Sequence, residues 1–190
     1  LAVLVFHVTV APNPGIDPPA PLYWLRAMEY GVQFFFVLSA LVLLHTYAPQ
    51  RRRPGWIPRY TIRRFFRIAP LYYVMCGLGA AICGASGRAW LFNLSFLFNL
   101  DETLFPGIAL AGWAVGVEML FYATVPLILA AIRDSRQALW LALACLAVSV
   151  LARLLLPSGP PGLVGTFNRH ALPSNLVFFA AGVVVFHVLL

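Results

Sequence analysis

The 190-residue sequence contains no lysine, and this absence limits its chemistry. Its 13 Lys or Arg positions are all arginines, and it has only six acidic residues. Lysine Schiff-base chemistry and a lysine general base are therefore excluded. Three cysteines (Cys76, Cys83 and Cys145) lie in apolar stretches and lack the CxxC or Cys/His spacing typical of zinc sites. We therefore expect neither a disulfide framework nor a metal site.

Charge of either sign is scarce. Charged residues make up 10% of the chain, hydrophobic residues make up 62%, and the mean hydropathy is +0.86. Soluble domains have about 25% charged residues, so this is the composition of a membrane protein. At about 20 residues per span, the length allows roughly six or seven spans. We expect an all-α, polytopic transmembrane helical bundle, because helices satisfy their own backbone groups in lipid. Membrane lipid is an expected partner, and nucleic acid is not.

Hydropathy places the expected spans along the chain. They cover about 1–10 (half a span), 31–47, 62–83 (bent near Pro70), 113–132, 137–156 and 174 onward. The segment 90–100 is apolar but short, so it is either a short span or a re-entrant piece, and we favour a span. Because the sequence begins and ends inside apolar runs, we expect a partial domain over 1–190, truncated in its first helix and at its C-terminal end.

The connector between the second and third expected spans is rich in arginine, from Arg51 to Arg67. The positive-inside rule therefore predicts that residues 48–62 face the cytoplasm. One interpretation of these arginines is an anchor on anionic lipid headgroups, and this suits Arg51 to Arg53. It suits Arg64 and Arg67 less well, because they lie deeper and share one helical face. A guanidinium at that depth favours an anionic partner.

Glu118 is the only acidic residue inside an expected span, and Tyr122 lies four residues on, on the same helical face. A carboxylate in hydrocarbon is costly unless it is paired or hydrogen-bonded, so Glu118 is either functional or part of a structural ion pair. If 90–100 spans, Glu118 lies near the level of Arg67, and we favour this case. If 90–112 is re-entrant, the helix direction reverses and Glu118 lies nearer His7. His7 poses a similar choice between an interior residue and a proton-transfer group.

Several motifs resemble, in order, those of acyltransferase family 3, the integral-membrane acyltransferases. They are "AVLVFHV", "GVQFFFVLSALVL", "RRFFRIAPLYY", "WAVGVEMLFYATVPLIL" and "FFAAGVVVF". The resemblance covers nearly the whole chain, and the arginine and glutamate motifs are its most specific parts. It implies a fragment of a larger bundle of about ten spans. The expected location is the bacterial inner membrane, as a multi-pass protein.

The resemblance implies transfer of an acyl group, expected to be acetyl, from cytoplasmic acyl-CoA to a hydroxyl of a glycan or other acceptor. His7 matches the family's catalytic histidine, and Glu118 is assigned with it as catalytic. Arg64 and Arg67 match the family's arginine pair and, with Tyr72 and Tyr122, are assigned to substrate binding. Acyl-CoA serves as the donor substrate, and no bound cofactor is implied.

The sequence departs from the family pattern in several places. Gln33 stands where an acidic residue is common, and Ala40 replaces the usual glycine. Residues 114–116, 119 and 120 also differ from the usual glutamate motif. These departures bear on the acceptor more than on the reaction type. A transporter or flippase with an Arg/Glu/His set, or a non-catalytic scaffold, remains an alternative. Hydrolase, metalloprotease and NTPase functions have no motif here.

Overall fold

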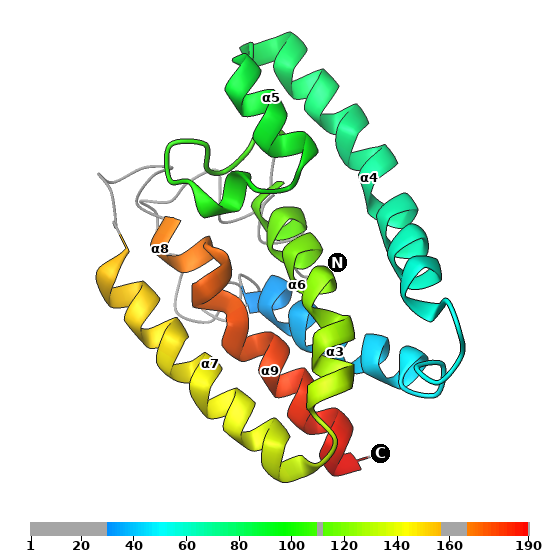
Figure 1. Cartoon of the computed structure of the whole chain (residues 1–190). Coiled ribbons are helices and arrows are strands. Elements are labelled where there is room, and N and C mark those ends of the chain that lie inside the picture. The colour runs from blue at the N-terminus through cyan, green and yellow to red at the C-terminus, as the bar shows by residue number, and fades with distance from the viewer. Residues whose placement is uncertain (1–29, 110–111, 157–166, 190) are drawn as a thin grey trace, which may run out of the picture.

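A computed structural model describes residues 30–109, 112–156 and 167–189, and within these ranges all regular structure is helical. The elements are α3 (Gly31–Tyr47), α4 (Trp56–Cys83), α5 (Gly87–Leu94), η3 (Phe98–Leu100), α6 (Gly112–Ala131), α7 (Ser135–Leu155), α8 (Phe167–His170) and α9 (Leu172–Leu189). Figure 1 shows the long helices packed side by side as a bundle. The all-α prediction is confirmed for this part of the chain.

Four segments are long and apolar enough to cross a membrane: α4, α6, α7 and the stretch Phe167–Leu189. The 17-residue α3 is apolar but shorter. Many large apolar side chains face outward, such as Leu71, Ile82 and Leu155 at 70%, 82% and 78% exposure. Such outward apolar surface suits contact with lipid. The expected six or seven spans are not reached within the described residues, and His7 lies outside them.

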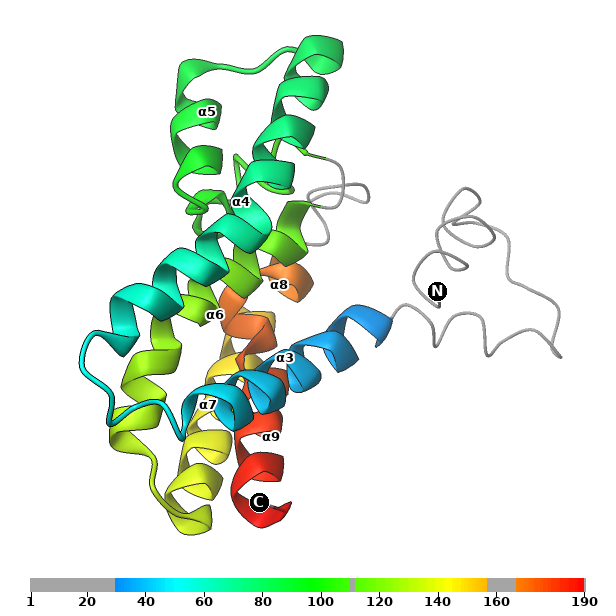
Figure 2. The ribbon, with the colours of Figure 1, turned by 90° about the vertical axis from the view of Figure 1, so that its right-hand side faces the viewer.

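Helix α4 begins earlier than the expected residue 62. Gly55, with φ of 68°, ends the connector in the left-handed region, and the helix starts at Trp56. Pro58 is tolerated because the first turn of a helix needs no backbone N–H donors. Pro70 lies inside the 28-residue helix, and Figure 2 shows the helix axis changing direction along its course. The arginines at 59, 63, 64 and 67 therefore all lie on one helix.

The expectation that 90–100 spans the membrane is wrong. Only Gly87–Leu94 is α-helical there, about 12 Å at 1.5 Å per residue, and the chain then turns through η3. Buried amides hold this turn: Asn93 Oδ1 accepts from the Ile108 N–H at 3.0 Å, and Asn99 Oδ1 accepts from the Leu172 N–H at 2.7 Å. Helix α6 therefore starts beside the middle of α4, where a Cβ atom at Gly112 would lie 3.4 Å from the Tyr72 ring, and it runs antiparallel to the first half of α4 (Figures 1 and 2).

This reversal gathers the arginines at one end of the bundle. Arg51 Nη1 donates to the Leu129 carbonyl at 3.2 Å, which joins the α3–α4 connector to the last turns of α6. Residues 48–63 and 132–136 together form what we call the arginine-rich end. It carries seven arginines: Arg51, Arg52, Arg53, Arg59, Arg63, Arg133 and Arg136. The described part of the opposite end carries three: Arg88, Arg153 and Arg169.

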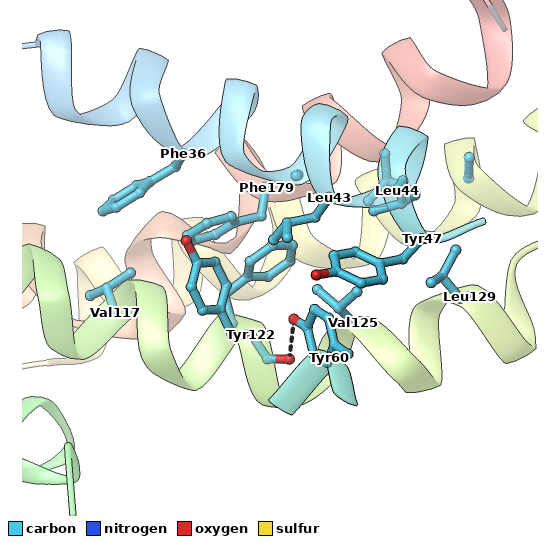
Figure 3. Close-up of a cluster of buried hydrophobic side chains, with 14 residues drawn as sticks. Phe36, Leu43, Leu44, Tyr47, Tyr60, Val117, Tyr122, Val125, Leu129 and Phe179 are labelled. Atoms are coloured by element: carbon cyan, nitrogen blue, oxygen red, sulfur yellow. Dashed lines mark hydrogen bonds between the residues drawn. The ribbon is translucent and has the colours of Figure 1, made fainter. Parts of the chain in front are cut away.

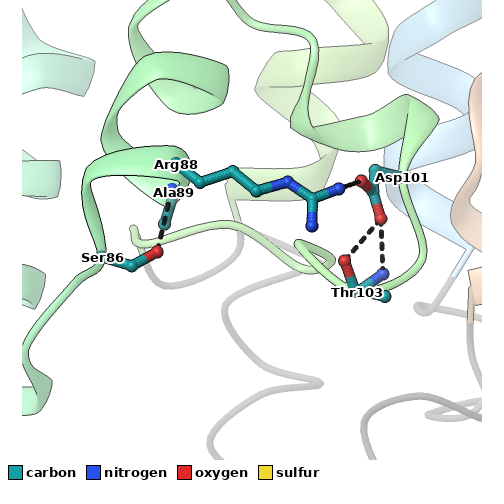
Figure 4. A network of polar contacts seen from close by, with 5 residues as sticks. All are labelled: Ser86, Arg88, Ala89, Asp101 and Thr103. Carbon is teal, nitrogen blue, oxygen red and sulfur yellow. Dashed lines mark hydrogen bonds and ion pairs between the residues drawn. The ribbon is translucent and has the colours of Figure 1, made fainter.

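The opposite end contains the one ion pair seen within the described residues, between Arg88 and Asp101 (Figure 4). Asp101 also accepts hydrogen bonds from the Thr103 hydroxyl at 2.6 Å and the Thr103 N–H at 2.9 Å. These bonds, with the nearby guanidinium, lower the pKa of the half-buried Asp101 carboxyl. The contacts close the turn that returns the chain to α6.

The main core lies between α3, the start of α4, α6 and α9, as Figure 3 shows. Phe179 of α9 stacks on Phe36 and Phe121, with ring centroids 4.6 and 3.9 Å away. Gly182 permits this close approach. A Cβ atom there would meet the Val37 carbonyl oxygen at 2.3 Å and the Ala40 Cβ at 2.7 Å. The core thus fixes α3 against α9, beside the inward face of α6.

Candidate functional site

Glu118 lies on the inward face of α6 with 7% of its surface exposed. Its Oε1 accepts a hydrogen bond from Ser39 Oγ of α3 at 3.1 Å and another from the Tyr122 hydroxyl, one helical turn further along α6. Among the described residues, hydroxyl groups and not a guanidinium therefore donate hydrogen bonds to this intramembrane carboxyl group. Both bonds end on the same oxygen. Within the described residues no hydrogen bond ends on Oε2.

Arg64 of α4 approaches the same group of side chains from the arginine-rich end. Its guanidinium carbon lies 5.4 Å from the ring centroid of Tyr47 and 5.9 Å from that of Tyr122. Both distances suit cation–π contacts. Its Nε is buried and has no hydrogen-bond partner in the described part of the chain. A buried guanidinium N–H without an acceptor is costly, so this group is suited to an anion that enters the bundle.

Antiparallel helices explain why Arg64 and Tyr122 meet. Arg64 lies eight residues after the start of α4 and Tyr122 nine residues before the end of α6, so the two lie at similar depth. A hydrogen bond of 2.8 Å from the Tyr60 hydroxyl to the Tyr122 carbonyl holds the helices at this register. Figure 3 shows this bond beside the ring of Tyr47. Glu118 thus lies near Arg64, although α6 runs opposite to the direction we expected.

Neither arginine of the predicted pair forms an ion pair with Glu118 among the described residues. Both act on its carboxyl group electrostatically without touching it. Arg64 is half-buried, whereas Arg67, almost one turn further along α4, is exposed. The structure therefore gives no structural ion pair at this site, which was one interpretation of Glu118.

A hollow of about 350 Å³ opens at the arginine-rich end, next to this cluster. Arg53, Arg59 and Arg63 line it, together with Thr46, Tyr47, Pro49, Gln50 and Trp56. We call it the outer hollow. Tyr47 forms part of its wall and also carries Arg64 on its ring, so it connects the hollow to the buried cluster. A row of guanidinium groups therefore leads from the surface toward Glu118.

Tyr72 lies outside the cluster around Glu118 and Arg64. Its hydroxyl donates to Asn93 Oδ1 at 2.7 Å, and its ring packs on Phe96 and Phe98 in a separate core near α5. His7 lies outside the described residues, so the structure does not show its position. Glu118, Tyr122 and Arg64 therefore form the described part of the site, with Arg67 near its edge.

Sequence reasoning did not identify three residues of this cluster: Ser39, Tyr47 and Tyr60. Ser39 could have been noticed as the single hydroxyl in an apolar run, because polar groups in spans require partners. Tyr47 and Tyr60 flank the arginine-rich connector, and no local pattern marks them. Among the described residues there is no group of three His, Cys, Asp or Glu side chains that could hold a metal ion.

A protein-family model described as "Acyltransferase domain" matches residues 1–188, almost the whole chain. Comparison with curated proteins finds no match, and comparison with solved structures finds none either. The family assignment therefore depends on the sequence match, and the arrangement of the site depends on the structure described above.

Proposed function

The chain belongs to acyltransferase family 3, and from that premise we propose that it transfers an acyl group from acyl-CoA to a hydroxyl group of an acceptor. The arginines around the outer hollow, together with Arg64, support acyl-CoA as the donor. CoA carries a diphosphate and a further phosphate, and guanidinium groups bind phosphate oxygens through paired hydrogen bonds. A thioester attached to such an anion would reach the Glu118 cluster.

We propose that His7 takes the proton from the acceptor hydroxyl as that oxygen attacks the thioester carbonyl. The new C–O bond forms, the C–S bond breaks, and the proton passes from the histidine to the departing CoA thiolate. Glu118 would orient the histidine through Oε2, which accepts no hydrogen bond from the described residues. The hydroxyls of Ser39 and Tyr122 fix the carboxyl group for this role. The Arg64 guanidinium contacts the rings of both Tyr122 and Tyr47, and these contacts connect the proposed donor site to Glu118.

We further propose that the acyl group is acetyl, that the acceptor is a glycan and that the protein lies in a bacterial inner membrane. These proposals are supported by the family resemblance and by the arginine-rich end, which the positive-inside rule assigns to the cytoplasm, where acyl-CoA is found. Gln33 bears on the acceptor, because an acidic residue is common at its position in the family.

The test is a transfer assay with labelled acetyl-CoA and candidate glycans, using the full-length protein. We expect His7→Ala to lower the rate about 10²- to 10⁴-fold while the protein still inserts into the membrane. Arg64→Ala should weaken donor binding about 10- to 100-fold, because a hydrogen bond to a charged group contributes about 1.5–3 kcal/mol. Arg64→Lys should restore only part of the affinity, because lysine keeps the charge and loses the paired donors.

Arg52→Ala is the matched control. It removes the same charge from the same end of the bundle, but Arg52 does not line the outer hollow. Equal losses at Arg52 and Arg64 would mean that the arginines act only as a surface anchor. If His7→Ala transferred the acyl group within a few-fold of the parent rate, His7 would not be the group that takes the proton.

A further inference from the structure

A second hollow, of about 470 Å³, lies at the arginine-rich end between the start of α4 and the last turns of α6. We call it the lateral hollow. It shares only Trp56 with the outer hollow and contains none of the residues assigned to the acyl-transfer site. Three arginines from two separate segments converge on it: Arg51 and Arg52 from the α3–α4 connector, and Arg133 from the α6–α7 turn.

No described residue compensates the positive charge in this hollow. No carboxylate lines it, and none of the three arginines forms an ion pair with another described residue. Arg51 donates one N–H to the Leu129 carbonyl, which holds its guanidinium over the end of α6. Three guanidinium groups in one hollow repel each other, so binding of an anion there is favoured.

The remaining wall is apolar and faces outward from the bundle. Ile57, Pro126 and Leu129 contribute to it, and Ile57 is 47% exposed. Leu127, next to this wall on α6, is 69% exposed. These residues belong to α4 and α6, two of the four candidate spans. The hollow therefore has a cationic part at the membrane surface and an apolar part toward the hydrocarbon.

We propose that the lateral hollow binds one anionic glycerophospholipid. Its phosphate lies among Arg51, Arg52 and Arg133, and one acyl chain lies along the apolar wall. A soluble phosphate compound would use only the cationic part, whereas a phospholipid complements both parts. Basic pockets between transmembrane helices at the cytoplasmic side are suited to lipid headgroups. The bound lipid would join the connector to the α6–α7 turn.

The test is native mass spectrometry of the full-length protein in detergent, titrated with dioleoyl phosphatidylglycerol, and with dioleoyl phosphatidylcholine as the neutral comparison. We expect one preferentially bound phosphatidylglycerol. Arg52→Ala and Arg133→Ala should each weaken its binding about fivefold, the contribution of one arginine near an anionic headgroup. Ala130→Trp, which places a bulky ring at the apolar wall without changing charge, should weaken it too.

Arg136→Ala is the matched control, because Arg136 lies at the same end but does not line the hollow. It should leave lipid binding unchanged. Equal weakening by Arg133→Ala and Arg136→Ala would show that lipid binding depends only on the overall positive charge of this end. Unchanged lipid binding in Ala130→Trp would show that the acyl chain does not lie along the apolar wall. Displacement of the lipid by CoA would assign the hollow to the donor. The transfer assay tests the enzyme activity separately, because it depends on Arg64 and not on Arg133.

Discussion

At the scale of single residues, a carboxyl group remains inside an apolar bundle because two hydroxyl groups satisfy one of its oxygens. Sequence alone selected Glu118, Tyr122 and Arg64 as candidates, since charged and polar residues stand out in apolar runs, and the structure brings the three side chains together. It did not identify Ser39 as the second donor, because that contact joins residues 79 positions apart. Contacts of this kind depend on how helices pack against each other, and the periodicity of a single helix does not predict that.

We predict that Tyr122→Phe destabilises the protein. The change removes one of two donors from a buried acceptor, and such a loss costs about 1–3 kcal/mol. Thermal unfolding in detergent should show a lower midpoint, and the transfer rate should fall with it.

Tyr47→Phe is the control for this experiment. It keeps a ring beneath Arg64 and removes a hydroxyl for which the described residues provide no partner. Its unfolding midpoint should remain close to that of the parent protein. If both variants lost the same stability, the bond from Tyr122 to Glu118 would not be what stabilises the site.

At the scale of helices, hydropathy predicted α3, α6, α7 and α9 to within about two residues, because long apolar runs define their ends. It failed at 90–100, since a largely apolar stretch of eleven residues fits either a short span or a turn. The outcome there depends on Asn93 and Asn99, whose side chains bind backbone groups distant in sequence. The direction of α6 follows from that turn, so it could not be deduced from composition.

Gly182 provides a test of helix packing. We predict that Gly182→Ala lowers stability by about 1–3 kcal/mol, because the new methyl group would overlap the Val37 carbonyl and force α3 away from α9. Gly77→Ala is the control, since a Cβ atom at that exposed helical position meets nothing within 4 Å. Unfolding midpoints of the two variants measure the difference. Equal midpoints would mean that α3 and α9 do not pack this closely.

At the scale of the whole molecule, folding places seven arginines at one end and, in the described part, three at the other. Sequence analysis predicted the cytoplasmic side for 48–62 from the connector alone. The structure adds Arg133 and Arg136 to the same end, which strengthens the same orientation. Positions 50 and 135 should therefore face the cytoplasm together, and position 103 should face outward.

Single cysteines at Gln50, Ser135 and Thr103, in a protein whose native cysteines are replaced by alanine, test this orientation. An impermeant thiol reagent added to intact cells should label only the cysteine at 103. All three should react once the membrane is opened. Labelling at 135 but not at 50 from outside would place the two segments on opposite sides and contradict the antiparallel course of α4 and α6.

In the proposed function the donor enters at the arginine-rich end and extends toward Glu118. A cryo-EM structure of the full-length protein with a non-hydrolysable acetyl-CoA analogue tests it most directly. We predict phosphate groups in the outer hollow beside Arg59 and Arg63, an anionic group of the donor within hydrogen-bonding distance of Arg64, and the acyl end near Glu118. An analogue bound at the opposite end, near Arg88 and Asp101, or in the lateral hollow beside Arg133, would contradict it.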